Sequence, residues 1–557
     1  MGRLVATICV ALGAGCAHRS ETTVSTALAS DHAPAQAGAA SHTETGAQFV
    51  DVAATAGLKY RWEVAGKRPL TILQTIGNGC AFLDYDNDGN QDILLVGPRL
   101  ALYRGDGKGK FTDVTASTGL DRLRGHFLGC GVGDYDNDGF DDIYITAYRG
   151  GMLLHNQQGR GFRDVTREAG IAAQPWGTSC TFADVDGDGR LDLYICNYAR
   201  FGPDTRQQLC LYNGIQSACG PRFYAPEKGT LYHNEGGGRF RDTTREWGLD
   251  AVQGKGLGVA AADYDGRGRP GVAIANDEMG GDLCDNFGHG MRLVGAKSGT
   301  AYDASGNVHG GMGLDWGDFD NDGRLDLAVA TFQHEAKSLY HNDGRGLFTD
   351  VAADAGLAEA TVPSVAFGVK FLDFDNDGVL DLIYANGHVQ DNIAEIDRTT
   401  TYRQHVQLLR GHAGRFEDVS AVAGEPFGRA IVGRGLATAD FDNDGRVDVL
   451  VVDSEGAPLL LHNETPQAGH WMAVRLTGTR SNRDGIGALV TVTTDRGKQM
   501  RLCHADGSYL SSSDRRVHVG LGASSKATVT VRWPSGHTDV RRNVDADRVI
   551  SITEGGQ

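Results

Sequence analysis

One short acidic motif is repeated seven times along the 557-residue chain, and it constrains the fold more than any other feature. The first copy reads Asp84-Tyr-Asp86-Asn-Asp88-Gly89-Asn90-Gln-Asp92, and the others begin at Asp134, Asp184, Asp263, Asp318, Asp373 and Asp440. Six copies keep Asp at positions 1, 3, 5 and 9 and Gly at position 6. Hard cations such as calcium take six to eight oxygen ligands, and clustered carboxylates repel one another without a cation. The motif therefore predicts metal-binding loops. The alternative is a set of acidic surface turns without metal, but such turns need only one or two Asp each.

The acidic repeats also dominate the charge of the chain. It contains 53 Lys and Arg residues against 71 Asp and Glu residues, which gives a net charge of −18. No basic face is present to neutralise phosphates, so we expect no nucleic-acid partner. The 79 glycines and 13 prolines are typical of a repetitive β protein with many tight turns.

The N-terminus has the features of an export signal. Arg3 precedes the apolar segment 4–12, which is too short to span a bilayer and ends in Gly13-Ala14-Gly15-Cys16. This ending resembles a bacterial lipoprotein box, although Gly13 stands where Leu is usual. We predict a signal peptide over residues 1–16, lipidation of Cys16 and a flexible tether over residues 17–47. The protein is then exported from a bacterial cell and either anchored in the membrane by its lipid or secreted. Cleavage by an ordinary signal peptidase is the alternative.

Two further motifs recur between the acidic loops. Phe-x-Asp-Val-x-x-x-x-Gly-Leu is first seen at residues 49–58, and Leu-Tyr-His-Asn is seen at residues 231–234 and 339–342. Each repeat thus contains four short strands: one before the acidic loop, one after it, and one in each of these motifs. Four-stranded units repeated about every 50 residues favour an all-β, seven-bladed β-propeller over residues 48–463. Residues 49–52 have no blade before them, so we expect them to complete the last blade and close the ring.

The cysteines fall into two groups. Cys80, Cys130 and Cys180 follow a small residue five places before each acidic loop, in a register that other repeats fill with Val or Leu. We interpret them as small buried apolar residues on inner strands. Cys210 and Cys219 lie nine residues apart in one loop of an exported protein, and a disulfide is the preferred interpretation.

The pattern changes at residue 464. Alternating apolar segments without acidic loops predict a separate small β-sandwich over residues 464–557. Its segments Asn482-Arg-Asp-Gly-Ile-Gly487, Gly507-Ser-Tyr-Leu-Ser511 and Arg516-Val-His-Val-Gly-Leu-Gly522 resemble an ASPIC/UnbV domain. The acidic loops resemble the FG-GAP/VCBS repeats of integrin α-chain propellers. The combination is similar to the cartilage acidic protein family.

The resemblance implies a calcium ion in each complete loop, held by positions 1, 3, 5 and 9 and by the carbonyl of position 7. These positions are Asp84, Asp86, Asp88, Asn90, Asp92, Asp134, Asp136, Asp138, Phe140, Asp142, Asp184, Asp186, Asp188, Arg190, Asp192, Asp318, Asp320, Asp322, Arg324, Asp326, Asp373, Asp375, Asp377, Val379, Asp381, Asp440, Asp442, Asp444, Arg446 and Asp448. The fourth copy, from Asp263, has Arg267 at position 5 and Gly271 at position 9. We therefore expect about six calcium ions, none of them in this loop, where Arg267 would replace the cation.

The strand order places all acidic loops on one face and the other connections on the opposite face. There the second strands of repeats three, four and six end in Asn197, Asn276 and Asn386, each followed by an expected insertion, at residues 198–230, 277–290 and 387–405. We predict that this face binds a ligand. The alternative is that the asparagines only cap strand ends and the insertions have no function.

Two functions fit this face. The first is binding of an extracellular protein or glycan, or of an unidentified small molecule, by a monomer that contacts the membrane only through its lipid. The second is a calcium-dependent hydrolase, isomerase or cyclase, with His388 or His309 as general base and Asp277 as its partner. No recognised catalytic motif is present in the chain to support one reaction.

Overall fold

The computed structural model describes residues 46–202, 205 and 208–556. The described residues belong to one compact unit, Thr45–Gln557. The predicted signal peptide, Cys16 and all but the end of the tether lie outside the described residues. Within the described residues, no helix is both long and apolar enough to cross a membrane.

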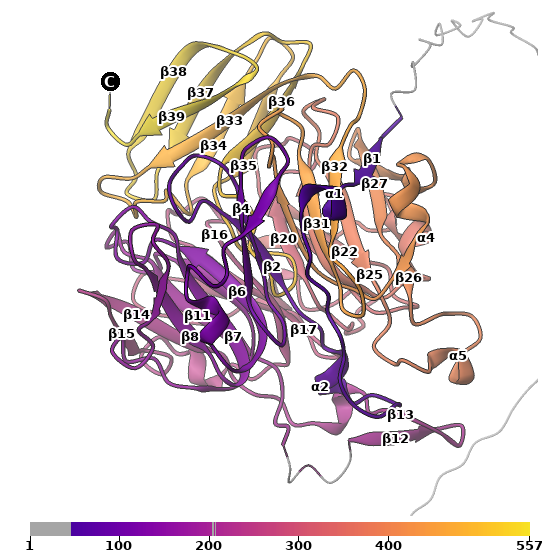
Figure 1. Cartoon of the computed structure of the whole chain (residues 1–557). Coiled ribbons are helices and arrows are strands. Elements are labelled where there is room, and N and C mark those ends of the chain that lie inside the picture. The colour runs from indigo at the N-terminus through magenta and orange to yellow at the C-terminus, as the bar shows by residue number, and fades with distance from the viewer. Residues whose placement is uncertain (1–45, 203–204, 206–207, 557) are drawn as a thin grey trace, which may run out of the picture. The chain divides into compact units, whose positions relative to one another are not determined.

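The described part of the chain is nearly all β, as predicted (Figure 1). Each repeat forms an antiparallel four-stranded unit, and we number these units 1–7 in the order of their acidic loops. Units 2 and 3 are joined into one eight-stranded sheet because β10 also pairs with β7. Unit 1 consists of β2 (Cys80–Leu83), β3 (Asp92–Leu95), β4 (Ala101–Gly105) and β5 (Phe111–Asp113), unit 2 of β6 (His126–Gly133), β7 (Asp142–Gly150), β8 (Met152–Asn156) and β9 (Phe162–Asp164), and unit 3 of β10 (Gln174–Ala183), β11 (Asp192–Asn197), β14 (Thr230–Gly236) and β15 (Arg239–Asp242). Unit 4 consists of β16 (Gly256–Ala262), β17 (Gly271–Asn276), β18 (Asp282–Asn286) and β19 (Met291–Leu293), and unit 5 of β20 (Leu314–Gly317), β21 (Asp326–Val329), β22 (Ser338–Gly344) and β23 (Leu347–Asp350). Unit 6 consists of β24 (Ala366–Leu372), β25 (Asp381–Asn386), β27 (Gln407–His412) and β28 (Arg415–Asp418), and unit 7 of β30 (Gly433–Ala439), β31 (Asp448–Asp453), β32 (Leu459–Asn463) and β1 (Phe49–Asp51).

The first strands of the units lie beside one another in a closed ring. The order is β2, β6, β10, β16, β20, β24 and β30, and β30 lies beside β2 again. As predicted, the strand that precedes the first unit completes the last one: β1 pairs with β32, with Phe49 opposite Asn463. This is the arrangement of a β-propeller, in which closure leaves no free sheet edge between the first and last units.

Short elements occupy the connections between the strands. The helices are α1 (Ala53–Ala56), α2 (Ile72–Thr75), α3 (Gly295–Ser298), α4 (Leu357–Thr361) and α5 (Ile393–Ile396), with 3-10 turns at Leu120–Arg122, Pro221–Phe223, Leu249–Ala251, Ser420–Val422 and Glu425–Gly428. Two small hairpin sheets pair β12 (Leu209–Tyr212) with β13 (Ile215–Ala218) and β26 (Gln404–His405) with β29 (Ala430–Ile431). Cys210 and Cys219 form a disulfide beside the first of these sheets.

The C-terminal domain is a β-sandwich, as predicted. Its strands are β33 (His470–Thr477), β34 (Leu489–Thr493), β35 (Lys498–Leu502), β36 (Val517–Gly522), β37 (Lys526–Arg532), β38 (Thr538–Asp545) and β39 (Arg548–Thr553). One sheet has the order β36-β33-β39 and the other β35-β34-β37-β38. Apolar side chains of both sheets, including Val474, Val490 and Val529, form one buried cluster between them.

The connection between β35 and β36 enters the centre of the ring, and we call residues 504–514 the axial segment. Ser508 and Leu314 exchange two backbone hydrogen bonds, of 2.6 and 3.2 Å. The amide of Cys130 donates to the carbonyl of Leu510 at 3.1 Å, and the amide of Ser512 donates to the carbonyl of Cys80 at 3.0 Å. The last domain of the chain therefore fills the axis around which the repeats are arranged.

The axial segment explains the glycines at positions 79 and 129. A Cβ atom on Gly79 would lie 1.7 Å from the carbonyl oxygen of Leu510, and one on Gly129 would lie 2.7 Å from the same oxygen. Neither distance is compatible with a side chain unless the backbone moves. Cys80 and Cys130 in the next register are buried free thiols.

Unit 4 corrects one expectation. The predicted insertion at residues 277–290 is wrong, because Asp282–Asn286 is the third strand of this unit and Met291–Leu293 is the fourth. The extra residues of the unit follow α3 instead, before β20 (Leu314–Gly317). The third strand has Asp285 where the other units have His or Arg, so its sequence does not match the motif.

Candidate metal sites and the opposite face

The first carboxylate of each acidic loop, and the last carboxylate of loop 1, hold the loop backbone. In loop 1, the carboxylate of Asp84 accepts the amide of Gly89 at 3.1 Å. The carboxylate of Asp92 accepts the amide of Tyr85 at 3.0 Å and that of Gly105, on the third strand, at 2.8 Å. The same position-1 to Gly contact is formed in all seven loops. The fully buried position-9 carboxylate thus ties the loop to the neighbouring strand.

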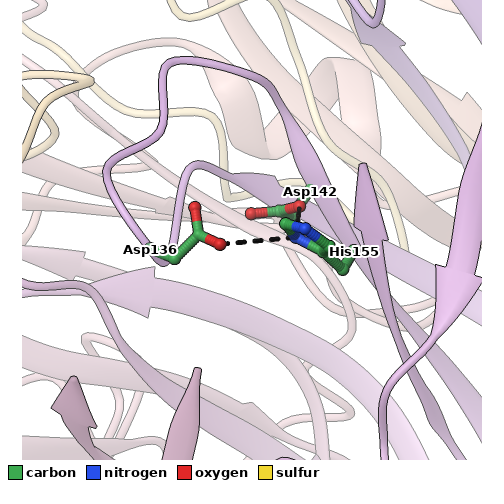
Figure 2. Close-up of side chains that lie close together, drawn as sticks. All are labelled: Asp136, Asp142 and His155. Atoms are coloured by element: carbon green, nitrogen blue, oxygen red, sulfur yellow. Dashed lines mark ion pairs between the residues drawn. The ribbon is translucent and has the colours of Figure 1, made fainter. Parts of the chain in front are cut away.

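A histidine from the third strand joins the acidic loop in four units. Figure 2 shows His155 of β8 facing Asp136 and Asp142, with its Nδ1 3.4 and 3.3 Å from their carboxylate oxygens. Equivalent groups are Asp186, Asp188 and His233; Asp320, Asp322 and His341; and Asp442, Asp444 and His462. Within each group the potential ligand atoms lie within 4.8 Å of one another. The recurring His of the Leu-Tyr-His-Asn motif was the sequence signal for these residues, and its role was not predicted.

The loops have the donor set of a cation site. Buried carboxylate oxygens of Asp84, Asp86, Asp318, Asp375 and Asp442 have no hydrogen-bond partner among the described residues. Burial raises the pKa of Asp92 and of Asp326 to about 8, and burial together with nearby Asp484 raises that of Asp134 to about 9. A cation would stabilise the charged carboxylates and satisfy the free oxygens. The acidic and histidine groups can therefore hold metal ions.

In the fourth unit, the acidic residue of the loop and the basic residue of the third strand have exchanged places. Arg267 forms ion pairs with both Asp265 of the loop and Asp285 of β18. Other units place an acidic residue at the loop position of Arg267 and a basic residue, such as His341 in unit 5, at the strand position of Asp285. The guanidinium therefore occupies the place between loop and strand that the sequence suggested for it.

The three asparagines of the opposite face fix the backbone of their own connections. The buried amide of Asn197 donates to the carbonyl of Lys228 at 3.1 Å, that of Asn276 to Gly280 at 2.9 Å, and that of Asn386 to His405 at 2.9 Å. The residues that follow them do reach a common space. Tyr198, Asp277 and Val389 line one pocket of about 210 Å³.

The candidate acid–base residues have other hydrogen-bond partners. His388 is fully buried, and its Nδ1 accepts the amide of Gln390 at 2.9 Å. His309 is also buried, and its Nε2 lies 2.8 Å from the hydroxyl of Tyr340. Burial lowers the pKa of His388 to about 3 and that of His309 to about 4. Among the described residues, no hydrogen bond or ion pair joins either imidazole to Asp277, so the predicted base–carboxylate pair is not formed.

Comparison with known families agrees with these features. A model for FG-GAP-like repeats matches residues 84–145, 134–195 and 318–384, and a model for ASPIC and UnbV matches residues 478–557. The chain carries FG-GAP-like repeats and an ASPIC/UnbV domain. Cartilage acidic protein 1 of Homo sapiens is 27% identical over 322 residues, which are 57% of this chain and 46% of that protein. The protein of the same name from Xenopus tropicalis is 27% identical over 303 residues, 52% of this chain and 43% of that protein. The matched part thus spans about half the length of these relatives.

Solved structures give only a distant likeness. A lectin of Agrocybe aegerita that recognises non-reducing terminal N-acetylglucosamine is 16% identical, covers 62% of this chain and 80% of its own, and has a TM-score of 0.37. An exotype rhamnogalacturonan lyase is 14% identical, covers 85% of this chain and 73% of its own, and has a TM-score of 0.30. Neither likeness indicates a ligand for this protein.

The ASPIC/UnbV domain lies on the acidic-loop side of the ring and contacts it through arginines. Arg475 lies 3.5 Å from the carboxylate of Asp84, and Arg532 lies 2.9 Å from that of Asp263. Arg516 donates to the carbonyl of Asp440 at 2.7 Å. Other contacts come from Arg483, Arg501 and Arg515. The motifs by which the domain was identified thus lie at its interface with the repeats.

Proposed function

We propose that this protein is an exported, calcium-binding β-propeller protein that binds an extracellular protein or glycan through the face opposite its acidic loops. The supporting observation is the difference between the two faces. The ASPIC/UnbV domain lies on the acidic-loop side, whereas the opposite side carries the long connections at 198–229 and 387–403 and the pocket between them. Binding sites usually lie on loops that a rigid scaffold positions.

Calcium is the ion proposed for the six complete loops. Positions 1, 3, 5 and 9 supply carboxylate oxygens and position 7 a carbonyl, which is the oxygen-rich set that calcium prefers. Bound calcium would neutralise the buried carboxylates. Metal analysis of the purified protein should find about six calcium ions per chain. Chelation should lower the melting temperature, because an ion that binds only the folded state stabilises it by about 4 kcal/mol per site at a concentration of 1,000 Kd. Zinc or manganese in place of calcium would refute the identity of the ion, since the histidines also suit those metals.

The binding face can be tested by shortening one connection. Residues 390–401 include α5, whose preceding residue Asn392 donates to the carbonyl of Gln216 at 2.9 Å and so joins the two long connections. Replacing this segment with a Gly-Ser linker should abolish binding on a glycan array or to a purified extracellular partner. The matched control replaces residues 235–238, which span the end of β14 and the turn before β15. Unchanged binding by the first variant, or equal loss by both, would contradict the proposal.

Export rests on the N-terminal sequence alone. Metabolic labelling with a fatty acid should modify the wild-type chain and not a Cys16→Ser variant, and both chains should leave the cytoplasm. Retention of the wild-type chain in the cytoplasm would refute this part of the proposal.

A further inference from the structure

The pocket on the loop-rich face has acidic groups in an apolar wall. It lies between the connections of units 3 to 6 and α2 (Ile72–Thr75), with a volume of about 210 Å³. Three carboxylic acids line it: Asp277, Glu278 and Glu335. Much of the remaining wall is apolar or aromatic, and includes Leu257, Met312, Phe332 and Phe367. The pocket therefore combines a large apolar surface with an excess of negative charge.

None of the three carboxylates forms an ion pair in the described part of the chain. Asp277 is 8% exposed and accepts only a neutral donor, the hydroxyl of Tyr198 at 2.5 Å. Glu335 accepts the amides of Gly310 and Phe332, at 2.9 and 3.3 Å. Asp277 is the buried one of the three, Glu335 is half-buried and Glu278 is exposed. A buried carboxylate without an ion pair is costly, so the cavity beside Asp277 favours a positively charged occupant.

Two nearby lysines, Lys255 and Lys337, favour the charged forms of Asp277 and Glu335 but form no ion pair with them in the described part of the chain. The ammonium of Lys337 donates to three backbone carbonyls, those of Phe332, Glu335 and Ser364, at 2.7–3.4 Å. Arg222 is the basic residue of the wall, and its guanidinium lies 5.3 Å from the ring centre of the neighbouring Phe223. The wall residues therefore carry three acidic groups against one basic group.

The backbone at Glu278 is consistent with a functional position. Glu278 has a φ of +51°, in the left-handed region that a residue with a Cβ rarely adopts. Such conformations cluster at ligand sites, where the surrounding structure maintains them. Here the conformation lies in the turn that also places Asp277 in the pocket wall.

We propose that this pocket binds a ligand through an ammonium group attached to a small apolar body, an inference that rests on the proposed binding function of this face. The three carboxylates would surround the ammonium group. Aromatic rings and Met312 would cover the apolar body, and the ring faces add a favourable cation–π contribution. An anionic ligand would face uncompensated repulsion, and a neutral one would leave the carboxylates unpaired.

Calorimetric titration of the calcium-loaded, full-length protein tests this inference with three probes. Phenethylammonium carries the charge and an aromatic body, 2-phenylethanol is its neutral isostere, and Nα-acetyl-lysine methylamide represents a lysine side chain of a protein. We expect phenethylammonium to bind at least about 10-fold more tightly than the alcohol, from the charge and cation–π contributions. Tighter binding of the lysine probe than of phenethylammonium would identify a protein lysine as the source of the same ammonium group.

A charge-removing variant separates charge from shape. Glu335→Gln should weaken phenethylammonium binding about 5-fold or more and leave the binding of 2-phenylethanol unchanged, since the amide oxygen can still accept the backbone hydrogen bonds. The control is Glu395→Gln, an exposed residue of α5 outside the pocket. Unchanged melting temperatures would show that both variants are folded, and Glu278→Gln provides a second test if Glu335→Gln does not fold.

Three results would overturn the inference: no binding by any probe, equal affinity for the amine and the alcohol, or equal loss of both in the variant. Replacement of residues 390–401 provides the independent test of the face as a whole. If that replacement abolishes glycan or protein binding while the amine does not bind, the ammonium pocket is refuted and the binding function stands. If the amine binds as expected and the replacement has no effect, the binding function is refuted and only the pocket stands.

Discussion

Removal of one side chain from the axial segment should destabilise the whole protein. Tyr509 is fully buried, its ring lies edge-on to Phe367 at a centroid distance of 4.9 Å, and its hydroxyl donates to the carbonyl of Ile76 at 2.8 Å. By analogy with large aromatic residues in protein cores, Tyr509→Ala should cost about 3–5 kcal/mol of unfolding free energy. Tyr509→Phe keeps the ring but leaves a buried carbonyl unpaired, and should cost about 1–2 kcal/mol.

Urea unfolding followed by tryptophan fluorescence measures both effects, with calcium held constant. The control is Tyr302→Ala. Tyr302 lies in the repeats and is 40% exposed, so the same substitution removes few buried contacts there. We expect the order Tyr509→Ala, then Tyr509→Phe, then the control, from least to most stable. If Tyr509→Ala falls within about 0.5 kcal/mol of the control, which is the usual range for surface substitutions, the axial segment does not stabilise the ring and the reasoning is refuted.

Three other perturbations test separate parts of the structure. Burial raises the pKa of Asp277 to about 7. The folded state therefore retains a proton that the unfolded state loses near pH 4. As a result, the unfolding free energy of the wild type should fall as the pH rises from about 4 to 7. Asp277→Asn should therefore be up to about 3 kcal/mol more stabilising at pH 8 than at pH 5, and equal effects at both pH values in urea titrations would contradict this. Arg267→Ala should leave the carboxylates of Asp265 and Asp285 facing each other without a cation. In chelator this should lower the unfolding free energy by about 1 kcal/mol, because the Arg267 guanidinium is partly exposed. The decrease in melting temperature should become smaller when salt is added, and a decrease independent of salt would argue against an ionic role. Gly79→Ala should force the backbone of the axial segment to move and lower the melting temperature, with a cost of about 1–3 kcal/mol, whereas a variant as stable as the wild type would show that the axis has spare room.

The repeats were predictable because their information is local. The acidic loops fix where the first strand of each unit ends and the second begins, and alternating apolar residues define the strands around them. The expectation that residues 49–52 complete the last unit followed from the order of motifs alone, and the pairing of Phe49 with Asn463 confirms it.

The axial segment could not be predicted in the same way. Residues 504–514 have no periodic pattern, and Leu510 contacts residues more than 300 positions away in the chain, such as Ser179. The only sign of this contact in the sequence is glycine at positions next to the axis, such as Gly79 directly before β2. Those glycines indicated crowding around an axis but not which residues fill it.

The third-strand residues were missed for a different reason. The His of the Leu-Tyr-His-Asn motif was visible in the repeats, but its approach to the acidic loop depends on pairing between the second and third strands. In unit 4, Asp285 replaces this His while Arg267 replaces the loop acid. A motif with His or Arg at this position does not match unit 4, whereas complementary charges at the two positions are common to all seven units.

Closure by β1 and filling of the axis by the ASPIC/UnbV domain together set the order in which this chain can finish folding. Strand β2 is complete at residue 83, yet its axial partner Ser512 is made more than 400 residues later. At a synthesis rate of about 5–20 residues per second, this delay is roughly 20–90 s. During that interval the inner strands have no axial partner, and until residue 463 is made β1 has no strand to pair with. The earliest repeats therefore depend on the last domain for their final state, which makes the time before that domain appears the period of greatest risk of misfolding.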